Sequence, residues 1–148
     1  MPWDTMASIL ANDGIEEKSR LELERMGHKV ISEKVNQEQL LNGALRDFDC
    51  IIVRSATTLD ETILGANTGS GSKLRLVIRA GVGLDNIDTI SAETLGLTVR
   101  NTPNASTNAV VELTIAHLIA NSRNLIGANL DMRCLLYTSP SPRDQEAS

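Results

Sequence analysis

Residues 76–88 place the strongest constraint on the fold of this chain. They read Leu-Val-Ile-Arg-Ala-Gly-Val-Gly-Leu-Asp-Asn-Ile-Asp. The apolar run over 74–78, interrupted only by Arg75, predicts a buried strand, and residues 80–83 predict a tight turn at its end. Open α/β sheets bind ligands at the carboxyl ends of their strands, and successive N–H groups of such a turn form a concave site for an anion. A small carboxylate or phosphate is therefore the expected guest.

Apolar segments alternate with helical segments along the rest of the chain. Strands are predicted at 8–11, 29–35, 50–53 and 97–99, and helices at 15–26, 60–66 and 89–95. Asn36 and Gln39 form a capping box, after which Leu41, Ala44, Leu45 and Phe48 fall on one helical face. A long helix is predicted from about Asn108 to Leu130. This order predicts an α/β, flavodoxin-like, open parallel five-stranded sheet with helices on both faces, plus a long C-terminal helix.

Composition narrows the class of protein. A chain of 148 residues with 41% hydrophobic residues suffices for one globular domain. The net charge of −5 argues against nucleic-acid partners and against an anionic membrane surface. No apolar run approaches the roughly 18 residues that span a bilayer, and the N-terminus lacks a secretory pattern. The two cysteines, Cys50 and Cys134, suggest neither zinc nor a disulfide framework, so a cytoplasmic protein without a metal is expected.

The end of the chain differs from the rest. Residues 133–148 have no periodic core pattern and contain two Ser-Pro pairs. They resemble a translated cloning adaptor, although composition also permits a natural disordered tail. We therefore expect one domain over 7–132 and a non-native or disordered tail over 133–148.

Two arginines follow neighbouring predicted strands. Arg54 and Ser55 come directly after the buried run over 50–53, and Arg79 comes directly after the strand predicted over 74–78. Each arginine offers a permanent charge and a planar fork of donors, and Ser55 adds a hydroxyl. Although a solvated loop arginine is the more usual case after a strand, the pair favours an anion site formed by Arg54, Ser55, Arg79 and the turn residues Ala80, Gly81, Val82 and Gly83.

Three ordered motifs carry a family resemblance. They are Val-Arg-Ser-Ala-Thr (53–57), Arg-Ala-Gly-Val-Gly-Leu-Asp-Asn-Ile-Asp (79–88), and Asn-Thr-Pro-Asn (101–104) followed by Val-Val-Glu-Leu-Thr (110–114). Together they resemble the N-terminal, substrate-binding half of the D-isomer-specific 2-hydroxyacid dehydrogenases, over about residues 7–132. The resemblance implies an NAD-dependent oxidoreductase acting on a small acidic metabolite such as 3-phosphoglycerate, in serine biosynthesis, and a homo-oligomeric complete enzyme.

The resemblance also implies roles for single residues. The matching turn holds the substrate carboxylate through its N–H groups, and Arg54, Ser55 and Arg79 suit an acidic substrate. Val82 and Asn104 would contact the cofactor, although Val82 lacks the hydroxyl that many phosphoglycerate-specific members carry at this position. The main NAD site and the catalytic residues would lie in a Rossmann domain absent from this fragment, so no catalytic residue is expected within it.

Other interpretations stay open. The segment Gly81-Val-Gly83 is not a dinucleotide fingerprint, because position 86 is Asn and the turn opens no long helix. Glycerate, hydroxypyruvate, lactate or formate could replace phosphoglycerate as the substrate type. A flavodoxin-like binding module such as a receiver is disfavoured, because Arg54 and Arg100 stand where such a module needs an Asp and a Lys. A third possibility is that the fragment alone does no chemistry.

Overall fold

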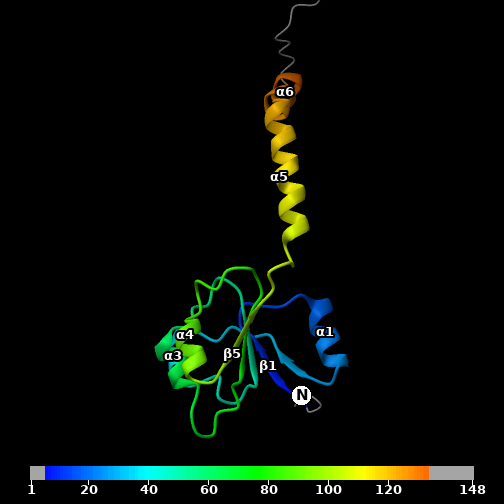
Figure 1. Cartoon of the computed structure of the whole chain (residues 1–148). Helices are drawn as coiled ribbons and strands as arrows, with labels where there is room; N and C mark the ends of the chain where they lie inside the picture. Colours follow the sequence, from blue (N-terminus) through cyan, green and yellow to red (C-terminus); the bar gives the residue numbers. More distant parts are fainter. Residues whose placement is uncertain (1–5, 134–148) are drawn as a thin grey trace, which may run out of the picture. The chain divides into compact units, whose positions relative to one another are not determined.

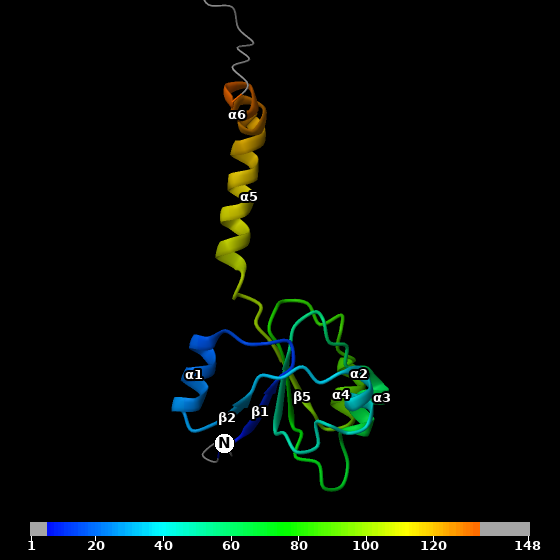
Figure 2. The same cartoon turned by 180° about the vertical axis from the view of Figure 1, so that it is seen from behind.

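The computed structural model describes residues 6–133 (Figures 1 and 2). Its elements in chain order are β1 (Ser8–Ala11), α1 (Glu17–Arg25), β2 (Lys29–Ile31), α2 (Gln37–Leu41), β3 (Cys50–Val53), α3 (Glu61–Ala66), β4 (Leu76–Arg79), α4 (Thr89–Thr94), β5 (Thr98–Asn101), α5 (Thr107–Ser122) and α6 (Leu125–Arg133). The five strands are parallel, in the order β2-β1-β3-β4-β5. The predicted flavodoxin-like sheet is confirmed.

The core lies on both faces of the sheet. All four residues of β3 are buried, and the alternation of side chains along a strand sends them to opposite faces. Ile51 and Val53 pack with residues of α2, α3 and α4, whereas Cys50 and Ile52 pack on the other face with Ile15 and Leu23, the latter from α1. Figures 1 and 2 show α1 on one side of the sheet and α3 and α4 on the other. Helices therefore cover both faces, as predicted.

Helices α3 and α4 begin at aspartates that cap their first turns. The side chain of Asp60 accepts a hydrogen bond from Ile63 N at 2.9 Å, and that of Asp88 accepts one from Ser91 N at 3.0 Å. The loops before these two helices run beside each other, because Leu59 and Ile87 form an isolated parallel bridge. Leu59 is fully buried. The bridge ties the segment after β3 to the segment after β4.

Apart from the long C-terminal helix, the ends of β2 and α2 differ most from the sequence prediction, and other boundaries shift by one or two residues. Strand β2 ends at Ile31 rather than at Val35, whose N–H donates to the Asn12 side chain at 2.7 Å instead of to a sheet partner. The capping box at Asn36 is confirmed, but α2 ends at Leu41 because Gly43 has a φ of 83°. Leu40 is consequently the buried residue of α2, and Leu41 is exposed, contrary to the predicted face.

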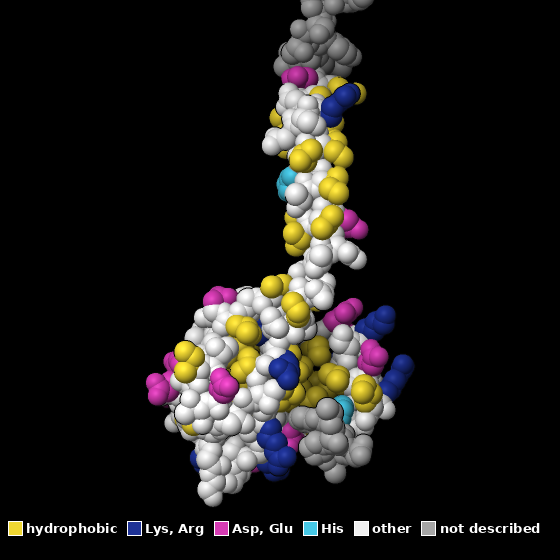
Figure 3. Space-filling view, in the orientation of Figure 1, with side chains coloured by type: hydrophobic (Ala, Val, Ile, Leu, Met, Phe, Trp, Pro, Cys, Tyr) yellow, Lys and Arg dark blue, Asp and Glu magenta, His cyan; other side chains and the backbone are white. Residues whose placement is uncertain are grey.

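The predicted long C-terminal helix is divided in two. Asn124 has a φ of 47°, which ends α5 and precedes α6, and Asn is among the few non-glycine residues that tolerate this conformation. The chain separates into two compact units, up to Ala105 and from Ser106 on. Neither α5 nor α6 has a buried residue, and Figure 3 shows hydrophobic side chains along α5. Arg133, the first residue of the predicted tail, ends α6, and residues 134–148 lie outside the described part of the chain.

Candidate functional site

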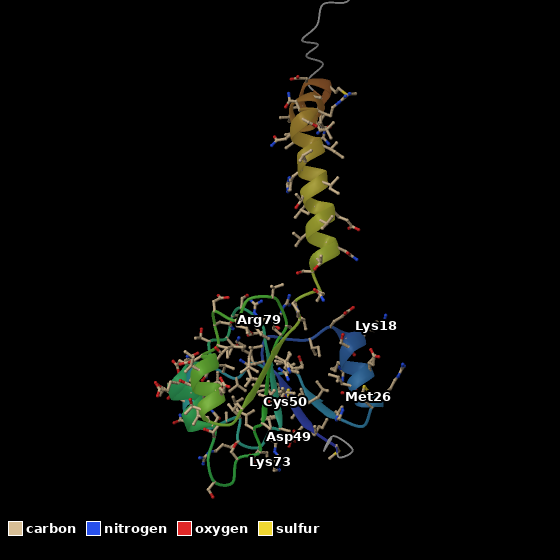
Figure 4. All side chains as sticks on the ribbon, in the orientation of Figure 1. Lys18, Met26, Asp49, Cys50, Lys73 and Arg79 are labelled. Atoms are coloured by element: carbon tan, nitrogen blue, oxygen red, sulfur yellow. The ribbon has the colours of Figure 1, made fainter. Side chains whose placement is uncertain are left out.

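Strands β3, β4 and β5 end side by side at one edge of the sheet. Val53 is the register partner of Arg79, and Arg79 is the partner of Asn101. Arg54 and Ala80 therefore occupy neighbouring positions, each one residue past a paired position. Figure 4 shows Arg79 at this carboxyl edge and Asp49 and Lys73 at the opposite edge. The structure thus places the predicted Arg54–Ser55 segment beside Arg79 and the glycine turn.

The side chain of Arg79 folds back over the turn that follows it. An ideal Cβ atom built on Gly81 would lie 2.0 Å from the Arg79 Nη1 atom and 2.8 Å from its Cζ atom. The guanidinium group therefore occupies the space that a side chain at position 81 would need. Arg79 Nε is buried and has no hydrogen-bond partner among the described residues. Lack of a side chain at Gly81 is thus what allows the positive charge to approach the backbone of the turn.

Two of the four predicted turn amides are already occupied. Ala80 N donates to Val53 O at 2.8 Å, which extends the ladder, and Gly81 N donates to Arg79 O at 2.9 Å. Within residues 6–133 the N–H groups of Val82 and Gly83 have no protein acceptor. The turn is held from β5, since Asn101 Nδ2 donates to Val82 O at 2.6 Å and Thr102 N donates to Gly81 O at 3.1 Å. The anion-binding capacity predicted for residues 80–83 is reduced to Val82 and Gly83.

The segment 54–57 is fixed through its backbone. Asp13 Oδ2 accepts from Arg54 N at 2.7 Å and from Thr57 N at 3.1 Å. Asn86 Nδ2 donates to Arg54 O at 2.7 Å and to Thr57 O at 2.6 Å. The side chains of Arg54 and Ser55 remain exposed. Sequence reasoning missed Asp13 and Asn86; the available signal was a polar residue just after strand β1 and another at the end of the glycine turn.

Some of the charged side chains at this edge form ion pairs and others do not. Lys34 forms an ion pair with Asp13, whose side chain is only 4% exposed. Neither Arg54 nor Arg79 forms an ion pair with any carboxylate in the described range 6–133. Two uncompensated guanidinium groups therefore remain at this edge of a chain with a net charge of −5. An anion placed there would supply the missing negative charge.

Within the described part of the chain, the remaining candidate residues form no hydrogen bonds with the glycine turn. Asn104 is exposed in the turn after β5, and none of the hydrogen bonds within 6–133 joins it to the glycine turn. His117 is exposed on α5. Burial raises the pKa of the Cys50 thiol to about 12, so this cysteine is a packing residue. No cluster of three metal-ligating side chains occurs in the described range.

Acid should remove part of the stability that Asp13 provides. Burial raises the pKa of its carboxyl group, but hydrogen bonds from Lys34, Thr57 and the Arg54 backbone outweigh burial, so the pKa lies below the ordinary 3.8. A lowered folded-state pKa means that the contribution is complete above the unfolded pKa and is lost as the pH falls through the folded value. The window of loss therefore lies below 3.8.

We expect Asp13→Asn to unfold more easily than the wild type at neutral pH. The difference in free energy of unfolding should shrink as the pH falls from 3.8 toward roughly 2. Urea denaturation at a series of pH values measures it. A difference that stays constant over this range would show that the negative charge of Asp13 contributes nothing.

Together these observations define a flavodoxin-like domain whose carboxyl sheet edge carries two arginines beside a glycine turn. The family model for the D-isomer specific 2-hydroxyacid dehydrogenase catalytic domain matches residues 9–141. The chain belongs to this family of oxidoreductases.

Three known proteins illustrate the relationship. The chain is 34% identical over 128 residues to D-3-phosphoglycerate dehydrogenase of Methanocaldococcus jannaschii, covering 86% of this chain and 24% of that protein. It is 33% identical to hydroxypyruvate reductase of Thermotoga maritima, covering 84% of this chain and 40% of that protein. The crystal structure of NAD+-bound 3-phosphoglycerate dehydrogenase from Entamoeba histolytica superposes with a TM-score of 0.62 at 31% identity, over 78% of this chain and 39% of that one. The chain thus spans less than half the length of each of these relatives.

No helix in the described part of the chain is long and apolar enough to cross a membrane.

Proposed function

We propose that this chain is the substrate-binding part of an NAD-dependent dehydrogenase that acts on the CH–OH group of a D-2-hydroxy acid, and that the acid is D-3-phosphoglycerate. The chain would hold the carboxylate and phosphate of the substrate at the carboxyl edge of the sheet. Arg54, Ser55 and Arg79 would bind its charged groups, with the amides of Val82 and Gly83. The activity would serve serine biosynthesis in the cytoplasm, in a homo-oligomeric complete enzyme.

One observation carries this proposal: two arginines without an ion pair, and two amides without a protein acceptor in the described range, lie at neighbouring strand ends. Guanidinium forks match the paired oxygens of carboxylate and phosphate, and backbone N–H groups favour an anion without adding side-chain entropy. The cationic edge opposes the overall negative charge of the chain, which argues for a local function of these arginines. D-3-phosphoglycerate carries an anionic group at each end and can satisfy both.

The glycine turn after β4 lacks the geometry of a dinucleotide-binding turn. A pyrophosphate site needs a glycine turn that opens directly into a helix, and here α4 begins at Thr89, six residues after Gly83. The Entamoeba relative is NAD+-bound, and we propose that the complete enzyme also uses NAD, held mainly by residues other than this turn. Val82, which is 53% exposed, and Asn104 are proposed to contact the cofactor from this side.

A second candidate substrate is glycerate or hydroxypyruvate. The Thermotoga relative is named for hydroxypyruvate, and its identity to this chain nearly equals that of the Methanocaldococcus protein. Val82 also lacks a hydroxyl at the centre of the turn. These smaller acids would use the open amides and Arg79 but would leave one arginine without a partner. Loss of a charge-assisted contact should make them weaker ligands.

Titration of the ¹⁵N-labelled chain with D-3-phosphoglycerate tests the proposal. We expect saturable chemical-shift changes at the amides of Ser55, Val82 and Gly83, and binding roughly tenfold tighter than that of D-glycerate at equal ionic strength. Inorganic phosphate and D-lactate are the comparison ligands. Tighter binding of D-glycerate would favour the second candidate. Shifts confined to other regions, or none with any of these acids, would contradict both.

A further inference from the structure

We propose that Asp13 and Asn86 are positioning residues for the acidic substrate, an inference that rests on the proposed function and deepens it. They hold the segment 54–57 from both sides, so that Arg54 and Ser55 are presented at the carboxyl edge in one arrangement. We call Asp13 and Asn86 the clamp. Neither clamp residue is proposed to touch the substrate.

The clamp fixes every backbone polar group at the two ends of the segment. Asp13 accepts from the N–H groups of Arg54 and Thr57, and Asn86 donates to the C=O groups of the same two residues. Thr57 Oγ1 also donates to Asp13 Oδ1 at 2.7 Å. A carboxylate can only accept hydrogen bonds and an amide NH₂ can only donate them, so Asp13 bonds the two N–H groups and Asn86 bonds the two C=O groups.

The clamp residues come from the two strands that flank β3. Asp13 follows β1, which pairs with β3 on one side, and Asn86 follows β4, which pairs with it on the other. The segment after β3 is thus held from both neighbours. Asn86 lies three residues after Gly83, and its own C=O accepts from Leu59 N at 2.8 Å. The clamp therefore links the segment that carries Arg54 to the turn that carries the open amides.

Apart from the clamp, the described residues hold the segment only at Thr57, whose Oγ1 accepts from Asn12 Nδ2 at 2.8 Å and from Lys34 Nζ at 3.2 Å. No hydrogen bond within 6–133 involves Ser55 or Ala56, and the side chains of Arg54 and Ser55 are exposed. Without the clamp, Arg54 and Ser55 would sample many conformations, and ordering them on binding would cost affinity. A preorganised segment avoids that cost.

Isosteric variants of the full 148-residue chain test the clamp. In Asn86→Asp, a carboxylate oxygen faces the C=O groups of Arg54 and Thr57 and repels them. In Asp13→Asn, the acceptor of two N–H groups loses its charge. We expect each variant to bind D-3-phosphoglycerate about tenfold more weakly in calorimetric titration. Hydrogen exchange at the Arg54 and Thr57 amides should become faster in Asp13→Asn.

Asn67→Asp is the matched control. Asn67 Nδ2 also donates to two backbone C=O groups, those of Leu40 and Ile63, but between α2 and α3. This variant should lose stability through the same repulsion, while its affinity for D-3-phosphoglycerate should stay within about twofold of the wild type. Equal weakening in Asn67→Asp and Asn86→Asp would mean that general destabilisation is responsible, and would overturn the inference.

A double-mutant cycle separates positioning from other effects. In an Arg54→Ala/Ser55→Ala background, the clamp has no substrate-binding side chains left to position, so adding Asp13→Asn should change the affinity by less than about twofold. A full additional loss would overturn the inference. So would wild-type affinity in both single clamp variants when Arg54→Ala/Ser55→Ala binds weakly. If the wild-type chain binds none of the acids tested, the proposed function fails and this inference fails with it.

Discussion

Replacing Arg79 with methionine is expected to weaken binding of D-3-phosphoglycerate by about a hundredfold, the largest effect on binding that we predict. Two charge-assisted hydrogen bonds from the guanidinium fork would be lost, and each contributes roughly 1.5 kcal/mol. Methionine keeps an unbranched, flexible stem but lacks the guanidinium atoms that lie over Gly81, so the charge is removed without adding bulk to the turn. Isothermal titration calorimetry of the 148-residue chain at fixed ionic strength measures the change.

Two further variants separate the effect of the guanidinium geometry from that of net charge. Arg79→Lys keeps the charge but not the planar fork, and it should recover only part of the affinity. Arg75→Met removes the same charge at an exposed position just before β4, at the opposite end of that strand, and should bind like the wild type. If Arg75→Met weakens binding as much as Arg79→Met does, the effect is one of net charge, and Arg79 has no specific part in the site.

The sheet was predictable because its central strands are short apolar runs bounded by polar residues. Cys50-Ile-Ile-Val53 is the clearest example, and its four side chains are all buried. The end of β2 was not predictable, because it depends on a side chain more than twenty positions earlier: Val35 turns away from the sheet to bond Asn12. Gly43, in contrast, was visible in the sequence, and its positive φ explains why the apolar pattern after Leu41 does not continue as a helix.

The candidate site was predictable in its location but not in its hydrogen bonding. Strand ends bring Arg54 and Arg79 to one edge in any parallel sheet in which their strands pair. Which turn amides stay open depends on how far the ladder runs, and it runs one residue beyond Arg79, through Ala80. The clamp joins residues 41 and 32 positions apart, and no local pattern reports contacts of that range. Sequence periodicity describes one element at a time, whereas these bonds link three.

Replacing Gly81 with alanine is expected to leave the fold intact and to weaken binding of D-3-phosphoglycerate by about thirtyfold. Gly81 does not have a positive φ, so alanine fits its backbone without strain. The new Cβ would meet Arg79 Nη1 and Cζ, which lie at the far end of a flexible side chain, and that side chain would move rather than the backbone. The guanidinium group would lose its position over the turn, while the free energy of unfolding should change by less than about 0.5 kcal/mol.

Gly65→Ala provides the matched control, because a Cβ at Gly65 meets nothing within 4 Å and Gly65 also has no positive φ. It lies in α3, so alanine should raise stability slightly and leave affinity unchanged. In the double variant Gly81→Ala/Arg79→Met, the loss should be no greater than in Arg79→Met alone, since both changes act on the same guanidinium group. Wild-type affinity in Gly81→Ala would show that Arg79 binds the acid from a position away from the turn. Additive losses in the double variant would show instead that Gly81 contributes through its backbone, independently of Arg79.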